Sequence, residues 1–221
     1  MIEQARLPNH GGRWPGWQSD LIYLPAGPVG GEHCDVFEYE GRLLFPVGDV
    51  SGKGVSASLL ASHLHAKFRS LAEAGLSVGR MMEAANRIFW RSSPRRSLQR
   101  WCWMHRAERH SRACQRAGHV PVVHVRREAL RLKPATARPL GLHEEARFPT
   151  QRLWVRPGEM LLICTDEACS PAQEEYGIER LQNIAQAWAD ATPARVLDAC
   201  LEDLFGFVAR AECLGDITCS R

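Results

Sequence analysis

Gly48-Asp-Val-Ser-Gly-Lys-Gly54 is the stretch that decides the fold of this chain. It follows an apolar run at 42–47 that is typical of a β-strand, and a helical pattern begins directly after it at Val55. Its glycines predict a loop, because glycine reaches backbone conformations that a side chain disfavours. A strand, a glycine-rich loop and a helix in this order raise two phosphate-binding interpretations, which must be tested first.

The loop fits both phosphate-binding patterns poorly. A Walker loop requires Ser or Thr after its lysine, whereas Lys53 is followed by Gly54. A dinucleotide fingerprint is formally met by Gly52, Gly54 and Ala57, but a second parallel strand would have to follow, and the sequence gives two helical patterns in a row. Nucleotide binding therefore stays open only as a weak alternative.

Outward from the loop, apolar periodicity predicts helix pairs between strand pairs. Residues 36–39 and 42–47 form a predicted hairpin around Glu40-Gly41, and residues 55–74 and 78–90 form two predicted helices. This grouping favours α+β layering over regular βαβ alternation. The other predicted elements are strands at 21–24, 120–125 and 130–132, a strand pair at 152–155 and 159–165 turned at Arg156-Pro-Gly158, helices at 177–188 and 193–208, and a last strand after Asp216.

Residues 91–116 are the least regular part of the sequence. The segment is rich in arginine, with Glu108 as its single acid, and neither helical nor strand periodicity is sustained in it. Trp90, Trp101 and Trp103 lie among the arginines, a composition that can bind single-stranded nucleic acid. We favour a divergent segment with solvated arginines, because the net charge of the chain is only +3. The sequence therefore predicts no nucleic-acid partner.

Acidic residues stand at the ends of several predicted strands. Glu32 and Asp35 precede the hairpin, Asp49 ends its second strand, Asp166 ends the apolar run at 160–165, and Asp216 begins the last strand. Carboxylates that converge at one edge of a sheet repel each other unless a hard cation neutralises them. All-oxygen ligation favours Mg²⁺ or Mn²⁺. Ordinary solvated turn acids are the alternative interpretation.

The order of the motifs resembles the SpoIIE/RsbU-type phosphatases, the bacterial branch of the PPM serine/threonine phosphatases. The resemblance covers almost the whole chain, and its most specific part is the Asp49 loop. It is carried by Gly30-Gly-Glu-His-Cys-Asp-Val-Phe37, Gly41-Arg-Leu-Leu44, Gly48-Asp-Val-Ser-Gly-Lys-Gly54, Ala117-Gly-His119, Pro121, Pro139-Leu-Gly-Leu142, Pro157-Gly-Glu-Met-Leu-Leu162, Thr165-Asp166, Tyr176-Gly177 and Asp216-Ile-Thr218.

The resemblance implies a four-layer α/β/β/α sandwich, in which two antiparallel sheets are flanked by helices. It implies two Mn²⁺ or Mg²⁺ ions, with Asp49 bridging them, the Val50 carbonyl holding one, and Asp166 as a ligand from the second half of the chain. Glu32 and Asp216 stand at or beside the other ligand positions. Catalysis through Asp49 and Asp166 would use a water molecule held by the metals as the nucleophile. The implied substrate is a phosphorylated anti-sigma-factor antagonist.

Three positions depart from the family pattern. Glu32 replaces an aspartate, and Glu167 replaces the glycine of a Thr-Asp-Gly turn. Gly215 replaces the first of two acids, the expected ligand, so that Asp216 is displaced by one residue and would face the other side of a strand. Two hypotheses follow: an active phosphatase, or a degenerate, catalytically weak or inactive phosphatase-like module that binds the phosphoprotein.

Length and composition agree with a single domain over residues 1–221, with a shortened last strand and a divergent segment at 91–116. The chain is 45% hydrophobic and 24% charged, as in soluble globular proteins. It has neither a signal-peptide pattern nor an apolar run long enough to cross a membrane, so we expect a cytoplasmic protein without membrane contact. No sensory domain is visible. An activating signal must therefore come from a separate partner, a homodimer contact or a further segment.

Histidine and cysteine spacing adds no ligand site. His63 and His65 are two residues apart on a predicted helix, so they do not face together. The eight cysteines form no Cys-x-x-Cys pair, and without a secretion signal we expect reduced thiols.

Overall fold

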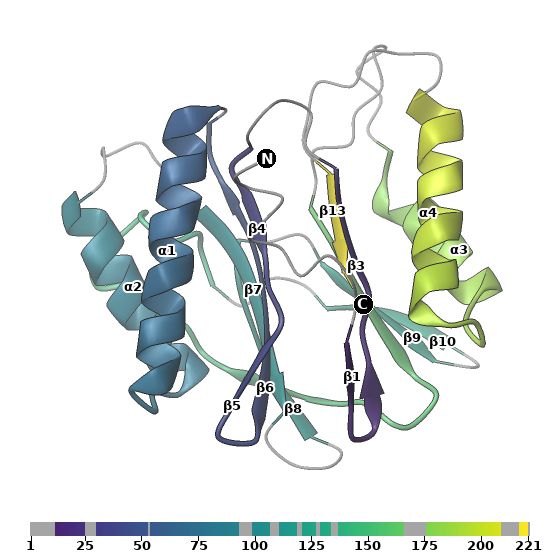
Figure 1. Ribbon diagram of the computed structural model, residues 1–221, viewed down its shortest axis with the longest axis horizontal. Coiled ribbons are helices and arrows are strands. Elements are labelled where there is room, and N and C mark those ends of the chain that lie inside the picture. Colours follow the sequence, from purple (N-terminus) through teal and green to yellow (C-terminus); the bar gives the residue numbers. More distant parts are fainter. Residues whose placement is uncertain are drawn as a thin grey trace. The chain divides into compact units, whose positions relative to one another are not determined.

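The computed structural model describes residues 12–24, 30–52, 54–92, 99–106, 111–118, 121–126, 129–133, 137–165, 176–208 and 217–220. These residues form two compact units (Figure 1). The first unit contains the described residues between 30 and 118 and between 137 and 155, and the second contains the others. Each unit has its own antiparallel sheet and its own helix pair.

The sheet of the first unit is built around its longest strand, β6. Two neighbours pair with β6 along one edge and a third pairs along the other, all antiparallel. The predicted hairpin around Glu40-Gly41 is confirmed: Glu40 (φ 49°) and Gly41 (φ 71°) both have positive φ, as a two-residue hairpin turn requires. The order is β11-β8-β7-β6-β4 with β5 beside β6, and the bounds are β4 Glu32–Cys34, β5 Phe37–Tyr39, β6 Arg42–Val50, β7 Gln99–Arg106, β8 Ser111–Ala117 and β11 Gln151–Trp154.

Two expectations about this sheet were wrong. The segment 91–116 does contain a strand pair, because β7 aligns with β6 from Leu44↔His105 to Val50↔Gln99 and β8 aligns with β7. Pairing with a neighbouring strand on each side creates these strands, although their own sequence lacks a strand pattern. The second error concerns residues 48–50, which continue β6 instead of opening the loop, because β4 and β7 pair with them.

Two helices cover one face of this sheet: α1 (Val55–Glu73) and α2 (Val78–Ser92), both close to the predicted bounds (Figure 1). Their apolar residues recur every three to four positions, so each helix presents one apolar stripe to the sheet. Asn86 is fully buried; its side-chain amide donates to the carbonyls of His143 and Glu144, and its oxygen accepts from the Gly141 amide. The core between helices and sheet includes Leu44, Leu64, Phe68, Met81, Met82, Phe89, Leu140 and Phe148.

The second unit has a five-stranded sheet and a second helix pair. The helices α3 (Ile178–Ala187) and α4 (Pro193–Val208) contact strands β9 and β3 respectively. The last strand is central, because β13 lies between β12 and β3. The sheet order is β10-β9-β12-β13-β3, with β3 Leu21–Leu24, β9 Val122–Arg126, β10 Ala129–Lys133, β12 Met160–Cys164 and β13 Ile217–Ser220; a separate ribbon pairs β1 (Arg13–Trp14) with β2 (Trp17–Gln18).

The predicted pairing of 152–155 with 159–165 was also wrong. The turn is present, with the Glu159 amide bonded to the Arg156 carbonyl, but β11 pairs with β8 whereas β12 pairs with β9 and β13. Each strand therefore finds its partners within its own unit. Helix pairs on antiparallel sheets confirm the α+β class, and each unit consists of one helix layer and one sheet layer.

Two smaller observations concern the cysteines and the helices. Cys34, Cys164 and Cys200 are buried, and the expected reduced state of the eight cysteines stays a prediction. Among the helices that the structure describes, none combines the length and the apolarity of a membrane span.

Candidate metal centre

Glu32 and Asp49 lie directly opposite each other on neighbouring strands. The register of β4 and β6 pairs Glu32 with Asp49, His33 with Gly48 and Cys34 with Val47. The Val50 amide bonds to the Gly31 carbonyl, and the Asp35 amide bonds to the Pro46 carbonyl. Hydrogen-bonded pairs alternate with non-hydrogen-bonded ones, so Glu32 and Asp49 form a non-hydrogen-bonded pair. In such pairs the side chains share a face and approach closely.

Both carboxylates are withdrawn from water. Glu32 is 3% exposed and Asp49 is 4% exposed. Two buried carboxylates on one face raise each other's energy when both are ionised, and a divalent cation removes this cost. The donor atoms are oxygens, which suit Mg²⁺ or Mn²⁺ better than zinc. The two residues therefore fit the predicted metal site, and Glu32 reaches this position although it is longer than aspartate.

The Val50 carbonyl lies where the chain leaves β6 for α1. Val50 is fully buried, and Gly31 of the neighbouring strand lies against its carbonyl oxygen. The following loop turns through Gly52 (φ 113°) and Gly54 (φ 72°), two conformations that L-residues with a side chain rarely adopt. Gly52 and Gly54 thus allow the turn into α1, and Gly31 allows its strand to approach Val50 closely.

Gly31→Ala is expected to disturb the Val50 carbonyl directly. The added Cβ would lie 2.7 Å from that oxygen and 3.0 Å from the Ala57 Cβ, so the backbone must shift. We expect the apparent dissociation constant for Mn²⁺ to rise about tenfold, since small misplacements of site atoms are costly. Calorimetric titration with Mn²⁺ measures this shift. Gly206→Ala, where the Cβ meets open space, is the control and should leave the titration unchanged.

The other predicted site residues lie outside the described residues. The structure does not describe Asp166 and Asp216. It also does not describe Glu167 and Gly215, two of the departures from the family pattern. Their roles as ligands or as disruptive replacements stay predictions. Lys53 and His119 are outside the described residues as well.

Asp35 does not join Glu32 and Asp49, although the sequence grouped these acids. It stands three residues after Glu32 and is 2% exposed. Its Oδ2 lies 2.6 Å from an Arg69 terminal nitrogen, 2.8 Å from Arg69 Nε and 2.7 Å from His65 Nε2. The His65 ring packs against that of His33, with centroids 4.1 Å apart. A second polar cluster, consisting of His33, Asp35, His65 and Arg69, therefore forms where α1 meets β4.

Sequence reasoning missed this cluster because it compared His65 only with His63. His33 and Asp35 are two residues apart, which places them on one face of an extended strand. His65 and Arg69 are four residues apart, which places them on one face of a helix. These two spacings were the available signal, but they do not show that the two faces meet.

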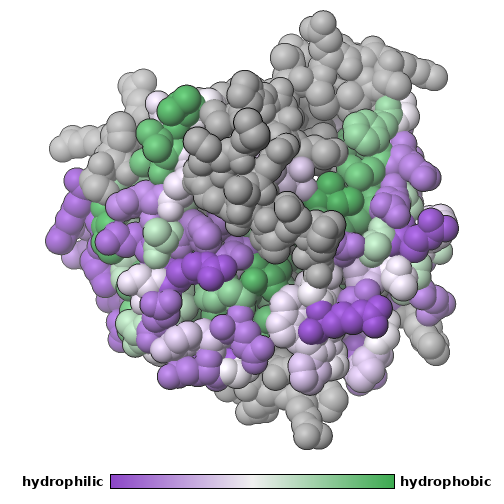
Figure 2. Space-filling model, viewed as in Figure 1, coloured by the Kyte–Doolittle hydropathy of each residue, from purple (hydrophilic) through white to green (hydrophobic). Residues whose placement is uncertain are grey.

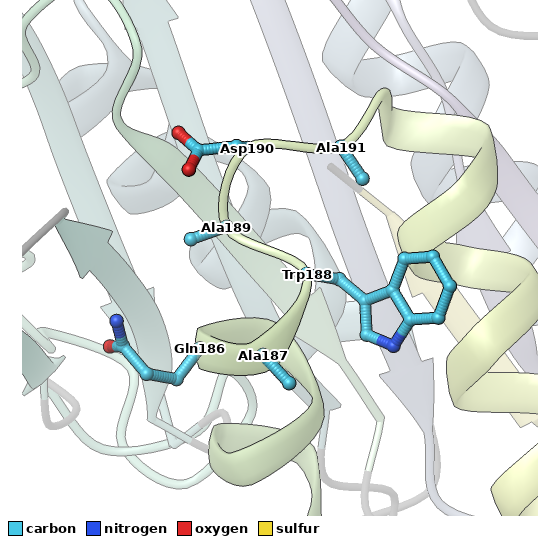
Figure 3. Close-up of a pocket in the computed structure, with 6 residues that line it drawn as sticks. All are labelled: Gln186, Ala187, Trp188, Ala189, Asp190 and Ala191. Atoms are coloured by element: carbon cyan, nitrogen blue, oxygen red, sulfur yellow. The ribbon is translucent and has the colours of Figure 1, made fainter.

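A surface pocket lies at the turn between α3 and α4 (Figure 3). It is lined by Gln186, Ala187, Trp188, Ala189, Asp190 and Ala191. The Trp188 ring and the Asp190 carboxylate project to opposite sides of the turn. Because this pocket is formed by one short segment and contains no predicted site residue, we assign it no role in catalysis.

Comparison with known proteins identifies the family. The family model described as Stage II sporulation protein E (SpoIIE) matches residues 39–219. The RsbU and RsbW domains of Rv1364c from Mycobacterium tuberculosis align with a TM-score of 0.76 at 24% identity, over 96% of this chain and 59% of that one. The SiaA-PP2C domain of Pseudomonas aeruginosa aligns with a TM-score of 0.80 at 16% identity, over 91% of this chain and 84% of that one.

A third solved structure, RsbX in complex with magnesium, aligns with a TM-score of 0.67 at 13% identity, over 92% of each chain. These similarities show a shared fold, while the family model covers most of the chain. Within that fold, the described carboxylates Glu32 and Asp49 lie on the paired strands β4 and β6. The chain belongs to the SpoIIE family, whose model matches most of its residues.

Proposed function

We propose that this chain is a protein serine/threonine phosphatase of partner-switching regulation, acting in the cytoplasm as one catalytic domain. Its substrate would be a phosphorylated protein of the anti-sigma-factor-antagonist type. The observation that carries the proposal is the buried, directly opposed pair of Glu32 and Asp49. Family membership supplies the reaction class, hydrolysis of a phosphate ester.

Glu32, Asp49, the Val50 carbonyl, Asp166 and Asp216 are proposed to hold two Mn²⁺ or Mg²⁺ ions. When bound, such ions polarise a phosphoryl group and activate water. The contribution of this chain is positional. Glu32 and Asp49 lie on paired strands, so the sheet fixes the distance between their backbones. This distance does not depend on which substrate is bound. Burial of the two carboxylates also strengthens their interaction with a cation.

An apolar surface beside the loop supports a protein substrate. Val55 and Leu59 lie one turn apart at the start of α1, directly after Gly54, and are 66% and 64% exposed. Figure 2 shows apolar surface over this end of α1. Exposed apolar groups near a site are typical of protein contacts. They therefore fit a folded regulatory protein better than a small phosphate ester.

The degenerate hypothesis keeps its support from Glu167 and Gly215. A protein of this kind would bind the phosphorylated partner without hydrolysing it. Retention of phosphate on a bound partner would distinguish it from the active enzyme.

The test is hydrolysis of p-nitrophenyl phosphate and of a phosphoserine protein by the metal-stripped chain, with and without added Mn²⁺ or Mg²⁺. We expect turnover that appears with metal and disappears with chelator. Release of inorganic phosphate is the measurement. If the folded protein binds the phosphoprotein but releases no phosphate at saturating Mn²⁺, the enzyme hypothesis is rejected in favour of the binding module.

A further inference from the structure

Three metal-ligating side chains meet where α1 packs on β4. His33 and Asp35 come from β4 and the residue that follows it, and His65 comes from α1. One donor atom from each, an imidazole nitrogen or a carboxylate oxygen, lies within 4.8 Å of the other two. His33 and Asp35 are buried, and 17% of the His65 side chain is exposed. The cluster is thus mostly dry but open to water at His65.

This cluster is separate from the predicted Mg²⁺ or Mn²⁺ site. Successive side chains of a strand point to opposite faces, so His33 and Glu32 lie on opposite faces of β4. His33 is opposite Gly48, which has no side chain to fill the space beside the imidazole. The packing of His33 against His65 identifies its face as the helix face. Glu32 and Asp49 occupy the other face.

We propose that His33, Asp35 and His65 form a binding site for a first-row transition-metal ion such as Zn²⁺. Two imidazoles and one carboxylate suit such ions, whereas Mg²⁺ prefers oxygen ligands. Metal–ligand bonds of about 2.1 Å in a tetrahedral arrangement hold the donor atoms about 3.4 Å apart. The three donor atoms lie within 4.8 Å of one another, so the distances between them have to change when the ion binds. Because 17% of the His65 side chain is exposed, water can reach the cluster as a fourth ligand.

Arg69 is the competitor for this site. Its guanidinium donates to Asp35 Oδ2, and its Nε also lies 3.0 Å from His65 Nε2. A bound dication would replace Arg69 as the counter-ion of the buried carboxylate. Arg69 can leave because 45% of its side chain is exposed, so its guanidinium can move into water. Metal binding and the Arg69 ion pair are therefore mutually exclusive.

The experiment is a Co²⁺ titration of the metal-stripped chain in excess Mg²⁺, followed by the visible absorption of Co²⁺. Excess Mg²⁺ fills oxygen-ligand sites, and addition of Zn²⁺ then tests for displacement. We expect one equivalent of Co²⁺ with imidazole-type absorption. His65→Gln and Asp35→Asn should each weaken binding at least tenfold. His63→Gln is the matched control, because His63 is exposed on the same helix and should not matter.

Two further variants keep the test independent of folding and of the phosphatase proposal. Arg69→Met retains all three ligands and should bind Co²⁺ at least as tightly as the wild type. Asp49→Asn should leave the Co²⁺ absorption intact, even where it abolishes turnover. The proposal is overturned when the folded wild type gives no such absorption, when His65→Gln binds like the wild type, or when Asp49→Asn removes the signal.

Discussion

Asp49→Asn is expected to lower metal-dependent turnover about a thousandfold, because a metal ion contributes several kcal/mol to stabilising the charge of the transition state. Asparagine keeps the shape of the side chain but removes the charge that holds the cation. In the metal-free protein the same change should raise the melting temperature, since Glu32 then faces a neutral partner across the strand pair. Steady-state hydrolysis and thermal unfolding, each with and without Mn²⁺, measure both effects.

Glu38→Gln is the matched control for Asp49→Asn. Glu38 lies in the same sheet, on β5, but it is exposed. Removing its charge should change neither turnover nor the Mn²⁺-dependent rise in melting temperature. Turnover of Asp49→Asn within tenfold of the wild type would show that Asp49 is not a principal ligand.

Arg69→Met is expected to destabilise the protein by about 2 to 3 kcal/mol at neutral pH. The change leaves the Asp35 carboxylate, which is 2% exposed, without its guanidinium partner. Removing one partner of a buried ion pair typically costs about 3 to 5 kcal/mol, and we expect less here because Arg69 is partly solvated. Methionine preserves the packing of the side-chain stem. Urea unfolding at neutral pH measures the loss.

The destabilisation should shrink as the pH falls. Burial raises the pKa of Asp35, but the His65 hydrogen bond and the charge and hydrogen bonds of Arg69 outweigh burial and hold this pKa below its ordinary value. The wild type therefore gains stability above the ordinary pKa of Asp35 and loses it as the pH falls through the lowered value. In Arg69→Met, burial is less opposed and the pKa rises. As the pH falls, Asp35 is therefore protonated in the variant before it is protonated in the wild type. The free energies of unfolding of the two proteins converge in acid.

Arg80→Met provides the control for this second prediction. Arg80 pairs with Glu83 at 3.3 Å on α2, but 70% of its side chain is exposed. We expect a loss of about 0.5 kcal/mol or less, because exposed helix pairs contribute little. A destabilisation of Arg69→Met that does not change with pH would mean that lost packing, not the Asp35 charge, explains it.

The sequence predicted most elements because their signals are local. The hairpin around Glu40-Gly41 has positive φ at both turn residues, and the apolar residues of α1 and α2 recur every three to four positions. β7 and β8 could not be predicted in this way. β7 is a strand because it pairs with β6, about 50 residues away in the sequence, and β8 pairs in turn with β7 and β11. The wrong pairing of residues 152–155 with 159–165 has the same cause, since a local turn does not determine which strands meet.

By itself, the sequence determined the family, the α+β class and the presence of Glu32 and Asp49 near the glycine-rich loop, since short-range order and motif spacing contain this information. Only the tertiary structure decided which faces these residues occupy. The β4–β6 register places Glu32 opposite Asp49 on one face of the sheet and His33 on the other face. The packing of α1 on β4 then brought His65 and Arg69 to Asp35. Register and helix packing depend on contacts between residues far apart in the chain, and no local pattern specifies them.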